Sequence, residues 1–289
     1  MQMNDYIELV NDKLSEFIQI EYPETIFKSM KYTVTLPGKR LRPVLCLETC
    51  RMFGGEIENA LPTACAIEML HAQTLIHDDL PCMDNDDFRR GKPSNHKVFG
   101  EATAVLAGDA LISYAPQVIL RNSKNLTADV LLQVLDDFFT AAGARGVIAG
   151  QVVDIESEGH PETHSAEKLD FIHDHKTGDL FRLAIVSGAR IAGADCEKIA
   201  EMREFAHNFG LAFQIADDIL DVVSDFETMG KTLGKDAQSG KLTYISMYGL
   251  DNAKCKLTCL LEKCDVIINK YNSEILREIV KGIRKRVGV

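Results

Sequence analysis

The sequence predicts an all-α fold. Apolar residues recur with helical spacing from end to end, whereas alternating runs bounded by turn residues are nearly absent. The 289 residues are 46% hydrophobic and 26% charged, a composition typical of globular proteins that bury a full core. Since no Pro/Gly/Ser-rich linker or low-complexity tract divides the chain, we expect a single domain over residues 1–289.

The N-terminal third begins with three predicted helices. The first runs from about Asn4 to Gln19, and the second runs from about Glu24 to Val34. A basic turn, Thr35–Pro43, then leads into an apolar helix whose predicted cap is the pair Gly54-Gly55.

A long apolar helix is predicted from about Asn59 to Asp79. Proline is tolerated in a first turn, where we expect Pro62, and Pro81 stops the helix. The apolar faces of later helices are broad, so several of them must be buried nearly all round in a large bundle. These later helices are expected near residues 101–121, 127–157, 165–191, 195–224, 251–269 and 272–286.

The charge and the apolar content of the chain exclude some classes of function and indicate its cellular compartment. A formal net charge of −11 argues against nucleic-acid binding, which needs clustered lysine and arginine. No apolar stretch approaches the roughly 18 to 20 residues needed to span a bilayer, so we expect no transmembrane segment. Because the N-terminus is acidic and amphipathic, we also expect no signal or transit peptide. The eight cysteines, such as Cys46, Cys50, Cys65 and Cys82, are expected to be buried small hydrophobes in a reducing compartment. We therefore expect a cytoplasmic protein.

The first acidic motif is DDLPCMD. Asp78 and Asp79 close the long helix, and the turn at Pro81 lets Asp84 return to the same side. Carboxylates at a helix C-terminus are disfavoured by the helix dipole, by up to about 1 kcal/mol each. A bound divalent cation reverses that effect, and Mg²⁺ prefers one or two carboxylates together with substrate phosphates.

The second acidic motif is QIADDILD. Asp217 and Asp221 are four residues apart in one helix and point from one face, with Asp218 beside them. Apolar neighbours such as Phe213 and Ile219 indicate carboxylates that line a cavity. For a single motif the alternative is a charged, solvated helix face. Two such motifs, each accompanied by basic residues, favour a metal and phosphate site.

Basic residues accompany both motifs. Arg89 and Arg90 follow the first motif, and Lys39, Arg40 and Arg42 lie in the GKRLRP turn. Arginine and lysine side chains both bind phosphate oxygens. The alternative for Arg89 and Arg90 is local neutralisation of nearby aspartates. His71 is interpreted as a hydrogen-bond donor to phosphate.

Two further segments carry lysines. Gly178 lies inside an apolar helix and predicts a kink that turns the Thr177 hydroxyl and freed carbonyls, next to Lys176, toward a cavity. Lys231 and Lys241 are spaced along a glycine-rich stretch suited to clamping an anion, although a solvated loop is the alternative.

In these motifs and their order, the sequence resembles the trans-polyprenyl diphosphate synthases over nearly its whole length. The resemblance rests on GKRLRP, EMLHAQTLIHDDLPCMDNDDFRRGKPSNHKVFGE, LAGDAL, GQVVDIE, HKTGDL, FQIADDILDVVSD and GKTLGKD. The two-residue insertion Pro81-Cys82 is similar to that of bacterial farnesyl diphosphate synthases and of plant and bacterial geranylgeranyl diphosphate synthases. One departure is Ile245, which follows Lys241-Leu242-Thr243-Tyr244 where the family commonly has proline. We expect altered geometry at the helix start there.

The resemblance implies an isoprenoid-synthase-type helical bundle around a deep central cavity, usually a homodimer. It implies that about three Mg²⁺ ions are bound through Asp78, Asp84 and Asp217, supported by Asp79, Asp218 and Asp221. It also implies two groups of diphosphate ligands. The allylic diphosphate would contact Arg89, Lys176, Lys231 and Lys241, with Thr177 and Gln214 facing the developing cation, and isopentenyl diphosphate would contact Lys39, Arg42, His71 and Arg90.

The implied reaction joins isopentenyl diphosphate to an allylic diphosphate and releases diphosphate. Gln73 and Thr74 precede the metal ligands by about one turn, and we expect their volume to limit product length. Gln73 is neither aromatic nor small. The overall resemblance to the bacterial enzymes makes farnesyl diphosphate the expected product, with geranylgeranyl diphosphate as the alternative. A terpene cyclase would lack GKRLRP, and a non-catalytic prenyl synthase subunit would usually lose an aspartate motif.

Overall fold

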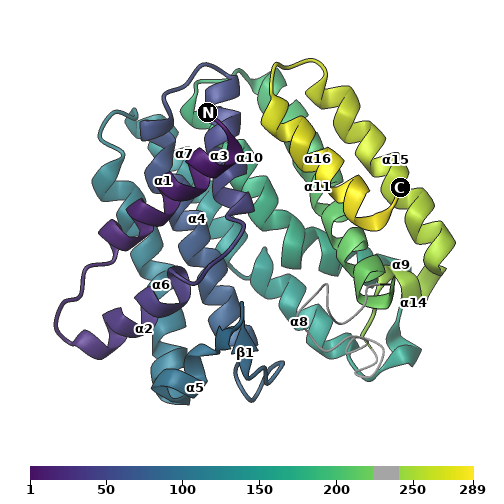
Figure 1. Ribbon diagram of the computed structural model, residues 1–289, viewed down its shortest axis with the longest axis horizontal. Coiled ribbons are helices and arrows are strands. Elements are labelled where there is room, and N and C mark those ends of the chain that lie inside the picture. Colours follow the sequence, from purple (N-terminus) through teal and green to yellow (C-terminus); the bar gives the residue numbers. More distant parts are fainter. Residues whose placement is uncertain (224–240) are drawn as a thin grey trace. The chain divides into compact units, whose positions relative to one another are not determined.

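The computed structural model describes residues 1–223 and 241–289, and it confirms the all-α prediction (Figure 1). Contacts divide the chain into two compact units, Met1–Phe138 with Ser187–Gly193 and Phe139–Val186 with Ala194–Val289. We call these unit 1 and unit 2 and describe each by itself. That residues 1–289 form one domain stays a prediction.

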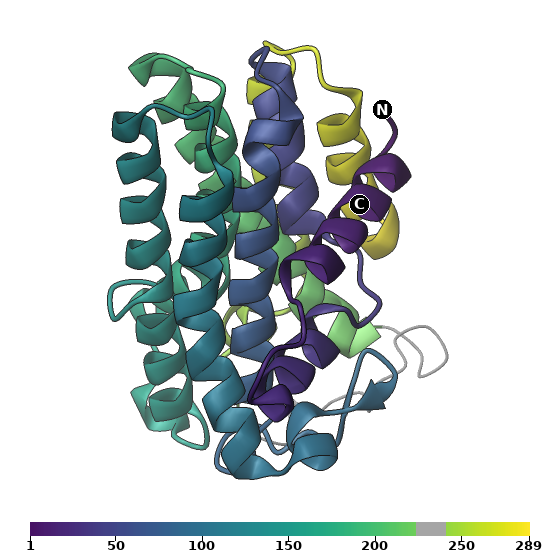
Figure 2. The ribbon, with the colours of Figure 1, turned by 90° about the vertical axis from the view of Figure 1, so that its left-hand side faces the viewer.

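Unit 1 is organised around two long helices that pack side by side, α4 (Ile57–Asp78) and α6 (Glu101–Asn122), as Figure 2 shows. Helix α3 (Leu41–Met52) packs on α4, and its side chains are buried over two full turns. The α3 helix ends as predicted, since Gly54 takes the left-handed conformation (φ +81°) that caps many helices. The remaining elements are α1 (Met3–Phe17), α2 (Glu24–Val34), β1 (Phe88–Arg89), β2 (Lys92–Pro93) and α5 (Asn95–Phe99), and α7 (Ala128–Ala142) begins in this unit.

One helix departs from the expectation that no segment is apolar enough to cross a membrane. Among the described residues, α6 is the one helix that is long and apolar enough to cross a membrane. The core helix of a soluble protein can be equally long and apolar, and α6 packs against α4, α2 and α5. Its apolar character is therefore weak evidence for a membrane span.

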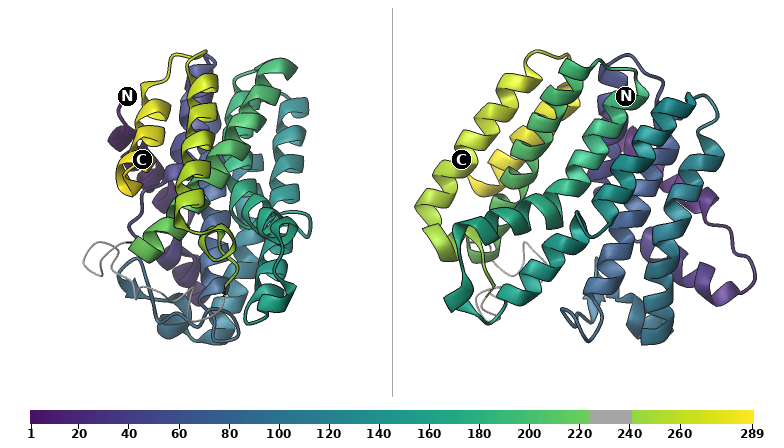
Figure 3. Two further views of the ribbon diagram at one scale, coloured as in Figure 1. Left: turned by 90° about the vertical axis from the view of Figure 1, so that its right-hand side faces the viewer. Right: turned by 180° about the vertical axis from the view of Figure 1, so that it is seen from behind.

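Unit 2 is built on α11 (Cys196–Val223), which packs against α15 (Leu250–Ile268) and α16 (Glu274–Val287), as the two views of Figure 3 show. Its core contains a ring cluster in which Phe181 meets Phe209 edge-on at 5.1 Å between centroids. A second group of contacts joins α8 (Val147–Ser157) and α9 (Ala166–Ile172) to the π-helix η2 (His173–Gly178). The unit also contains η1 (Pro161–Thr163), most of α10 (Asp179–Ile191) and α14 (Tyr244–Tyr248).

Several predicted boundaries are corrected by the structure. The helix expected over residues 127–157 is two helices, because the chain breaks between Ala142 and Val147, where Gly143 and Gly146 stand. Helix α4 begins at Ile57, so Pro62 lies in its second turn and not its first. All eight cysteines are free thiols. Four are buried as expected (Cys46, Cys50, Cys65 and Cys264), whereas the expectation is wrong for Cys82, Cys196, Cys255 and Cys259, which are exposed.

Candidate active site

The first aspartate motif closes α4 as predicted. Asp78 is the last helical residue and Asp79 is the cap. The following turn brings the backbone back, since the N–H of Asp84 donates to the carbonyl of Asp78 at 2.9 Å. Asp79 differs from its two neighbours because its side chain is buried (2% exposed) and accepts from the Arg89 guanidinium. The motif thus separates into Asp78 and Asp84, which reach solvent, and Asp79, which anchors an arginine.

A short hairpin after the motif sets the two arginines in place. Strands β1 and β2 pair antiparallel, with Arg89 opposite Lys92. The two residues between them, Arg90 and Gly91, both have positive φ (+52° and +75°), as a tight two-residue hairpin turn requires. Arg90 therefore takes a conformation that costs a non-glycine residue about 1 kcal/mol. Strain of this kind is found at functional sites.

Arg89 contacts acidic side chains on both sides. Its Nε donates to Asp79 Oδ1 at 2.9 Å, and its Nη2 lies 3.2 Å from Asp86 Oδ2. Burial alone would lower the pKa of Arg89, but the hydrogen bond and the charge of Asp79 outweigh it and raise the pKa. These contacts agree with the alternative interpretation, in which Arg89 neutralises nearby aspartates. The guanidinium has five N–H donors, so it can also bind another ligand.

Arg90 and the GKRLRP turn meet in unit 1. The Arg90 Nη1 lies 3.5 Å from the carbonyl oxygen of Leu36, and a Cβ on Gly38 would stand 2.8 Å from the same nitrogen. Gly38 thus leaves the room that the guanidinium occupies. Arg42 Nη1 lies 3.5 Å from the His71 Nε2, so three of the residues predicted to bind isopentenyl diphosphate, Arg42, His71 and Arg90, belong to one cluster with this turn.

Arg40 of the GKRLRP turn holds this cluster together with Glu68, which the sequence reasoning missed. Arg40 and Glu68 form a buried ion pair of 2.6 Å, and Arg90 Nη2 lies 3.4 Å from the same Glu68 oxygen. Arg40 also has a positive φ (+46°) immediately before α3. The signal was present, because a glutamate inside an otherwise apolar helix must be paired when it is buried.

His71 is neutral in this setting. Burial, together with the charges of Arg42 and Arg90, lowers the pKa of His71 well below its usual value. Since a guanidinium can only donate, the hydrogen bond from Arg42 requires the ring Nε2 to accept. The predicted donation to phosphate therefore has to come from Nδ1, or from a ring that gains a proton as an anion binds.

Gln73 has the hydrogen-bond partner that a buried amide needs. Its Nε2 lies 3.1 Å from the His77 Nδ1 one turn later, and the His77 Nε2 lies 3.2 Å from the Val105 carbonyl on α6. A Cβ on Gly108 would stand 2.0 Å from His77 Nε2, so that glycine gives the ring its space. Gln73 is 8% exposed and fixed by this chain of contacts. Thr74 donates to the backbone of its own helix at His71.

The second aspartate motif presents two carboxylates on one face of α11. Asp217 and Asp221 are one turn apart and both partly exposed. Asp217 Oδ1 lies 3.6 Å from Arg286 Nη2 on α16. A cation of this chain therefore stands near one of the oxygens that are predicted to bind metal.

Asp218 is turned into the core of unit 2. Its Oδ1 accepts from the Gln214 amide at 3.0 Å, and its Oδ2 accepts from the backbone N–H of Tyr244 at 2.8 Å. Gln214 in turn accepts from the Thr177 hydroxyl at 2.8 Å. Burial, with smaller contributions from Asp221 and Asp154, raises the pKa of Asp218 to about 6. Three predicted site residues thus form one hydrogen-bonded chain.

The predicted kink at Gly178 is the π-helix η2. Wide turns of this type are frequent at functional sites. Lys176 Nζ donates to Asp154 Oδ2 at 2.5 Å, and His173 lies across from Asp218 at 3.7 Å. Burial lowers the pKa of His173 to about 4. His175 contacts Asp179, so the two histidines contact different carboxylates.

The segment around Lys241 begins an intact helix despite Ile245. Thr243 caps α14, accepting from Ser246 N at 3.1 Å, while Ser246 Oγ accepts from Thr243 N at 2.9 Å. This reciprocal capping box replaces the effect of a proline. That the geometry at this helix start differs from that of the family stays a prediction. Lys231 lies outside the described residues.

The donor set suits magnesium better than a metal held by protein alone. Among residues 1–223 and 241–289, no group of three or more His, Cys, Asp or Glu side chains is placed to hold a metal ion. The motifs instead offer carboxylates in small groups, Asp78 with Asp84 and Asp217 with Asp221. Mg²⁺ commonly binds one or two carboxylates and completes its shell with water and substrate phosphates. The residues present fit that ion.

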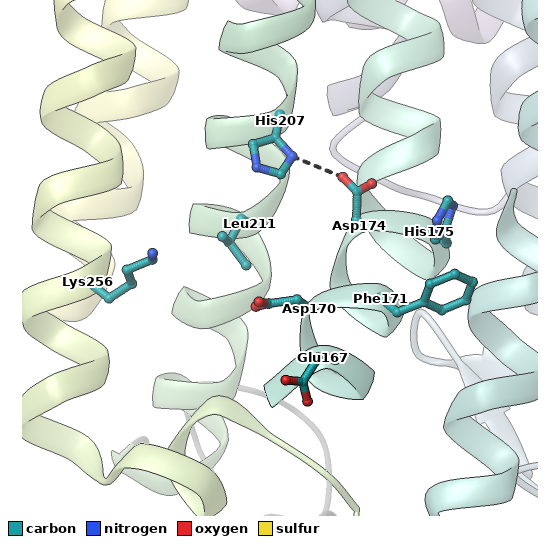
Figure 4. A pocket seen from close by; sticks show the side chains of 8 residues that line it. All are labelled: Glu167, Asp170, Phe171, Asp174, His175, His207, Leu211 and Lys256. Atoms are coloured by element: carbon teal, nitrogen blue, oxygen red, sulfur yellow. Dashed lines mark hydrogen bonds and ion pairs between the residues drawn. The ribbon is translucent and has the colours of Figure 1, made fainter. Parts of the chain in front are cut away.

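A separate cavity of about 400 Å³ lies in unit 2, and none of the predicted site residues lines it (Figure 4). Asp174 faces it and accepts from His207 Nδ1 at 3.0 Å. The wall mixes acidic, basic and apolar side chains. They are Glu167, Asp170, Phe171, Asp174, His175, His207, Leu211 and Lys256.

Comparison with known proteins decides the family. The model of the family described as polyprenyl synthetase matches residues 23–281. The chain belongs to the polyprenyl synthetase family. It is therefore of the trans-prenyltransferase type, whose members act in isoprenoid biosynthesis, and the resemblance noted in the sequence is confirmed.

Relatives of the chain are named for different products. It is 44% identical over 269 residues to a geranylgeranyl diphosphate synthase of Cyanophora paradoxa, covering 93% of this chain and 87% of the relative. It is 46% identical over 262 residues to a farnesyl diphosphate synthase of Geobacillus stearothermophilus, covering 90% and 88%. Its structure resembles that of an FPP/GFPP synthase from Zymomonas mobilis with a TM-score of 0.85, at 33% identity, covering 97% and 96%.

Proposed function

We propose that this chain is a short-chain trans-prenyltransferase that condenses isopentenyl diphosphate with dimethylallyl and geranyl diphosphates to give farnesyl diphosphate. The observation that carries the proposal is the cation cluster of unit 1, where Arg90 lies over Gly38 and Arg42 stands beside His71. A cluster of this kind suits the oxygens of a diphosphate. An enzyme that only cyclises an allylic diphosphate has no use for a second diphosphate site, which argues against a terpene cyclase.

The metal ligands under this proposal are Asp78 and Asp84 in the first motif and Asp217 and Asp221 in the second. When bound, about three Mg²⁺ ions would neutralise the charge that develops on the leaving diphosphate. Asp79 and Asp218 differ from these four aspartates, because their carboxylates accept hydrogen bonds within the protein. Asp79 accepts from Arg89, and Asp218 accepts from Gln214 and Tyr244. Both act chiefly as anchors of neighbouring groups.

The basic residues stabilise the leaving group as the allylic C–O bond breaks. Arg89, Lys176, Lys231 and Lys241 bind the allylic diphosphate, while Lys39, Arg42, His71 and Arg90 bind isopentenyl diphosphate. Donors fixed before the reaction stabilise developing charge without reorganisation. Thr177 and Gln214 present oxygens toward the allylic cation. The double bond of isopentenyl diphosphate attacks that cation, and the departing diphosphate takes the proton that is lost.

Farnesyl diphosphate is favoured because Gln73 is held by His77 and cannot fold aside freely. A fixed side chain of this size acts as a floor for the growing tail. Geranylgeranyl diphosphate is the second candidate, since Gln73 is smaller than an aromatic ring and the Cyanophora paradoxa relative bears the name of that product.

The proposal also covers assembly and place of action. We propose a homodimer in the cytoplasm. Apolar side chains that face solvent on α6 and α7 support a second copy as partner: Leu106, Leu120 and Leu132 are 59%, 54% and 66% exposed. Sedimentation equilibrium on the purified protein tests it, and a monomer at micromolar concentration would contradict it.

The function is tested by incubating the purified chain with isopentenyl and dimethylallyl diphosphates and separating the products by chromatography. We expect a fifteen-carbon diphosphate with Mg²⁺ and no product with EDTA. Equal turnover in EDTA would contradict the metal assignment. Failure of the purified chain to act alone would instead favour a non-catalytic subunit.

A further inference from the structure

The GQVVDIE segment, which the proposed function leaves without a role, contacts the π-helix of unit 2. Gly150 and Asp154 stand one turn apart on the same face of α8. Asp154 Oδ2 accepts from Lys176 Nζ at 2.5 Å, and the side chains are only 12% and 24% exposed. A Cβ on Gly150 would stand 2.2 Å from the backbone nitrogen of Lys176. One residue therefore fixes the side chain of Lys176, and the other allows its backbone to approach.

Two neighbouring helices hold the end of η2. Asp154 on α8 binds Lys176, and Gln214 on α11 binds the adjacent Thr177 at 2.8 Å. A lysine side chain has about 2 kcal/mol of rotamer entropy, which an ion pair at its end largely removes before any ligand arrives. The ammonium has three donors, so a bond to Asp154 leaves others for a phosphate oxygen.

We propose that Asp154 is a positioning residue that holds the Lys176 ammonium ready for the diphosphate of the allylic substrate, with Gly150 setting the backbone distance. The inference rests on the proposed role of Lys176. Asp154 acts through Lys176 and touches no reacting atom. Because a preorganised cation acts where charge develops, its loss lowers kcat as well as diphosphate affinity.

The competing explanation is an ion pair that only stabilises the fold. A double-mutant cycle separates the two, because a residue that acts through Lys176 has nothing left to position once Lys176 is gone. The cycle uses Asp154→Asn, Asp154→Ala, Lys176→Met and the two combinations. Asparagine keeps an oxygen acceptor, so this variant preserves the fold if alanine does not. Glu156→Ala is the matched control, since it removes an exposed carboxylate from the same helix.

Two quantities are measured for each variant: the Kd of inorganic diphosphate in the presence of Mg²⁺, by calorimetry, and kcat with dimethylallyl diphosphate. We expect Asp154→Ala to weaken diphosphate binding and lower kcat by about tenfold each, while the KM for isopentenyl diphosphate changes less than about twofold. In the Lys176→Met background the same substitution should change either quantity by less than about twofold.

An equal loss in both backgrounds would overturn the proposal in favour of a structural role. Unchanged or tighter diphosphate binding by Asp154→Ala would overturn it as well. If the wild-type chain makes no prenyl product yet the binding cycle gives the expected coupling, the proposed function fails and the positioning of Lys176 stands.

Discussion

The backbone N–H of Tyr244 donates to the buried carboxylate of Asp218 at 2.8 Å. This bond ties the second aspartate motif to the start of α14, three residues after Lys241. Because Asp218 also accepts from Gln214, one carboxylate fixes both the segment that follows Lys241 and the residue that contacts Thr177. A side chain predicted as a metal ligand thus organises unit 2 from within.

Replacing Asp218 by asparagine should separate stability from activity. Burial raises the pKa of Asp218 to about 6, so the ionised carboxylate opposes folding at pH 7. A neutral amide at this position should therefore leave the free energy of unfolding unchanged or raise it by about 1 kcal/mol. The amide has one acceptor oxygen where the carboxylate has two, so the Lys241 segment loosens and kcat falls about tenfold. Urea unfolding and steady-state kinetics measure both, with exposed Glu262→Ala as control. A large loss of stability together with full activity would contradict this account.

His71 should make stability depend on pH. Its pKa in the folded chain is well below the ordinary value of about 6.5, so below pH 6.5 the unfolded chain takes up a proton that the folded chain does not. Stability therefore falls as the pH falls. We expect His71→Asn to lose less stability than wild type between pH 7 and pH 5, by about 1 kcal/mol in urea unfolding. Parallel pH curves for the two proteins would show that His71 is not held neutral.

Product length should respond to Gln73. Gln73→Phe places a ring at the proposed floor and should shift the products of isopentenyl and dimethylallyl diphosphates toward ten carbons, whereas Gln73→Ala should lengthen them toward twenty. Chromatography of the products gives the distribution, and Ser113→Ala, an exposed change on α6, is the control. If both Gln73 variants match wild type, the floor is a different residue deeper along the tail.

Arg90 should affect one substrate more than the other. Its guanidinium lies over Gly38 beside the GKRLRP turn, so Arg90→Ala should raise the KM for isopentenyl diphosphate about tenfold and the KM for the allylic substrate by less than about threefold. Initial-rate kinetics with each substrate varied in turn measures both. The reverse preference would mean that the two diphosphate sites have been exchanged.

The fold class and most helices follow from the sequence because helical periodicity and proline positions are local signals. The stop after Asp79, the cap at Gly54 and the irregular turn before Gly178 were all predicted on such grounds. The break between α7 and α8 was missed, because the apolar pattern runs on through residues 127–157. The same holds for the hairpin at Arg90, since an arginine with positive φ is an unusual choice that tertiary contacts impose.

In the candidate site, residue types were easier to predict than their partners. The aspartates and cations are found by composition and spacing. That Asp79 binds Arg89, that Asp218 binds Tyr244 and that Lys176 binds Asp154 depends on packing between helices far apart in sequence. Glu68 could have been found, because a buried carboxylate in an apolar helix requires a cation such as Arg40.

The central claim, magnesium-dependent prenyl transfer by both aspartate motifs, is tested most directly by the turnover of Asp78→Ala and Asp217→Ala with isopentenyl and dimethylallyl diphosphates. We predict that each lowers kcat by about a thousandfold, since losing metal-assisted charge stabilisation costs several kcal/mol, while thermal unfolding stays within a few degrees of wild type. Turnover within about tenfold of wild type in either folded variant would contradict the claim.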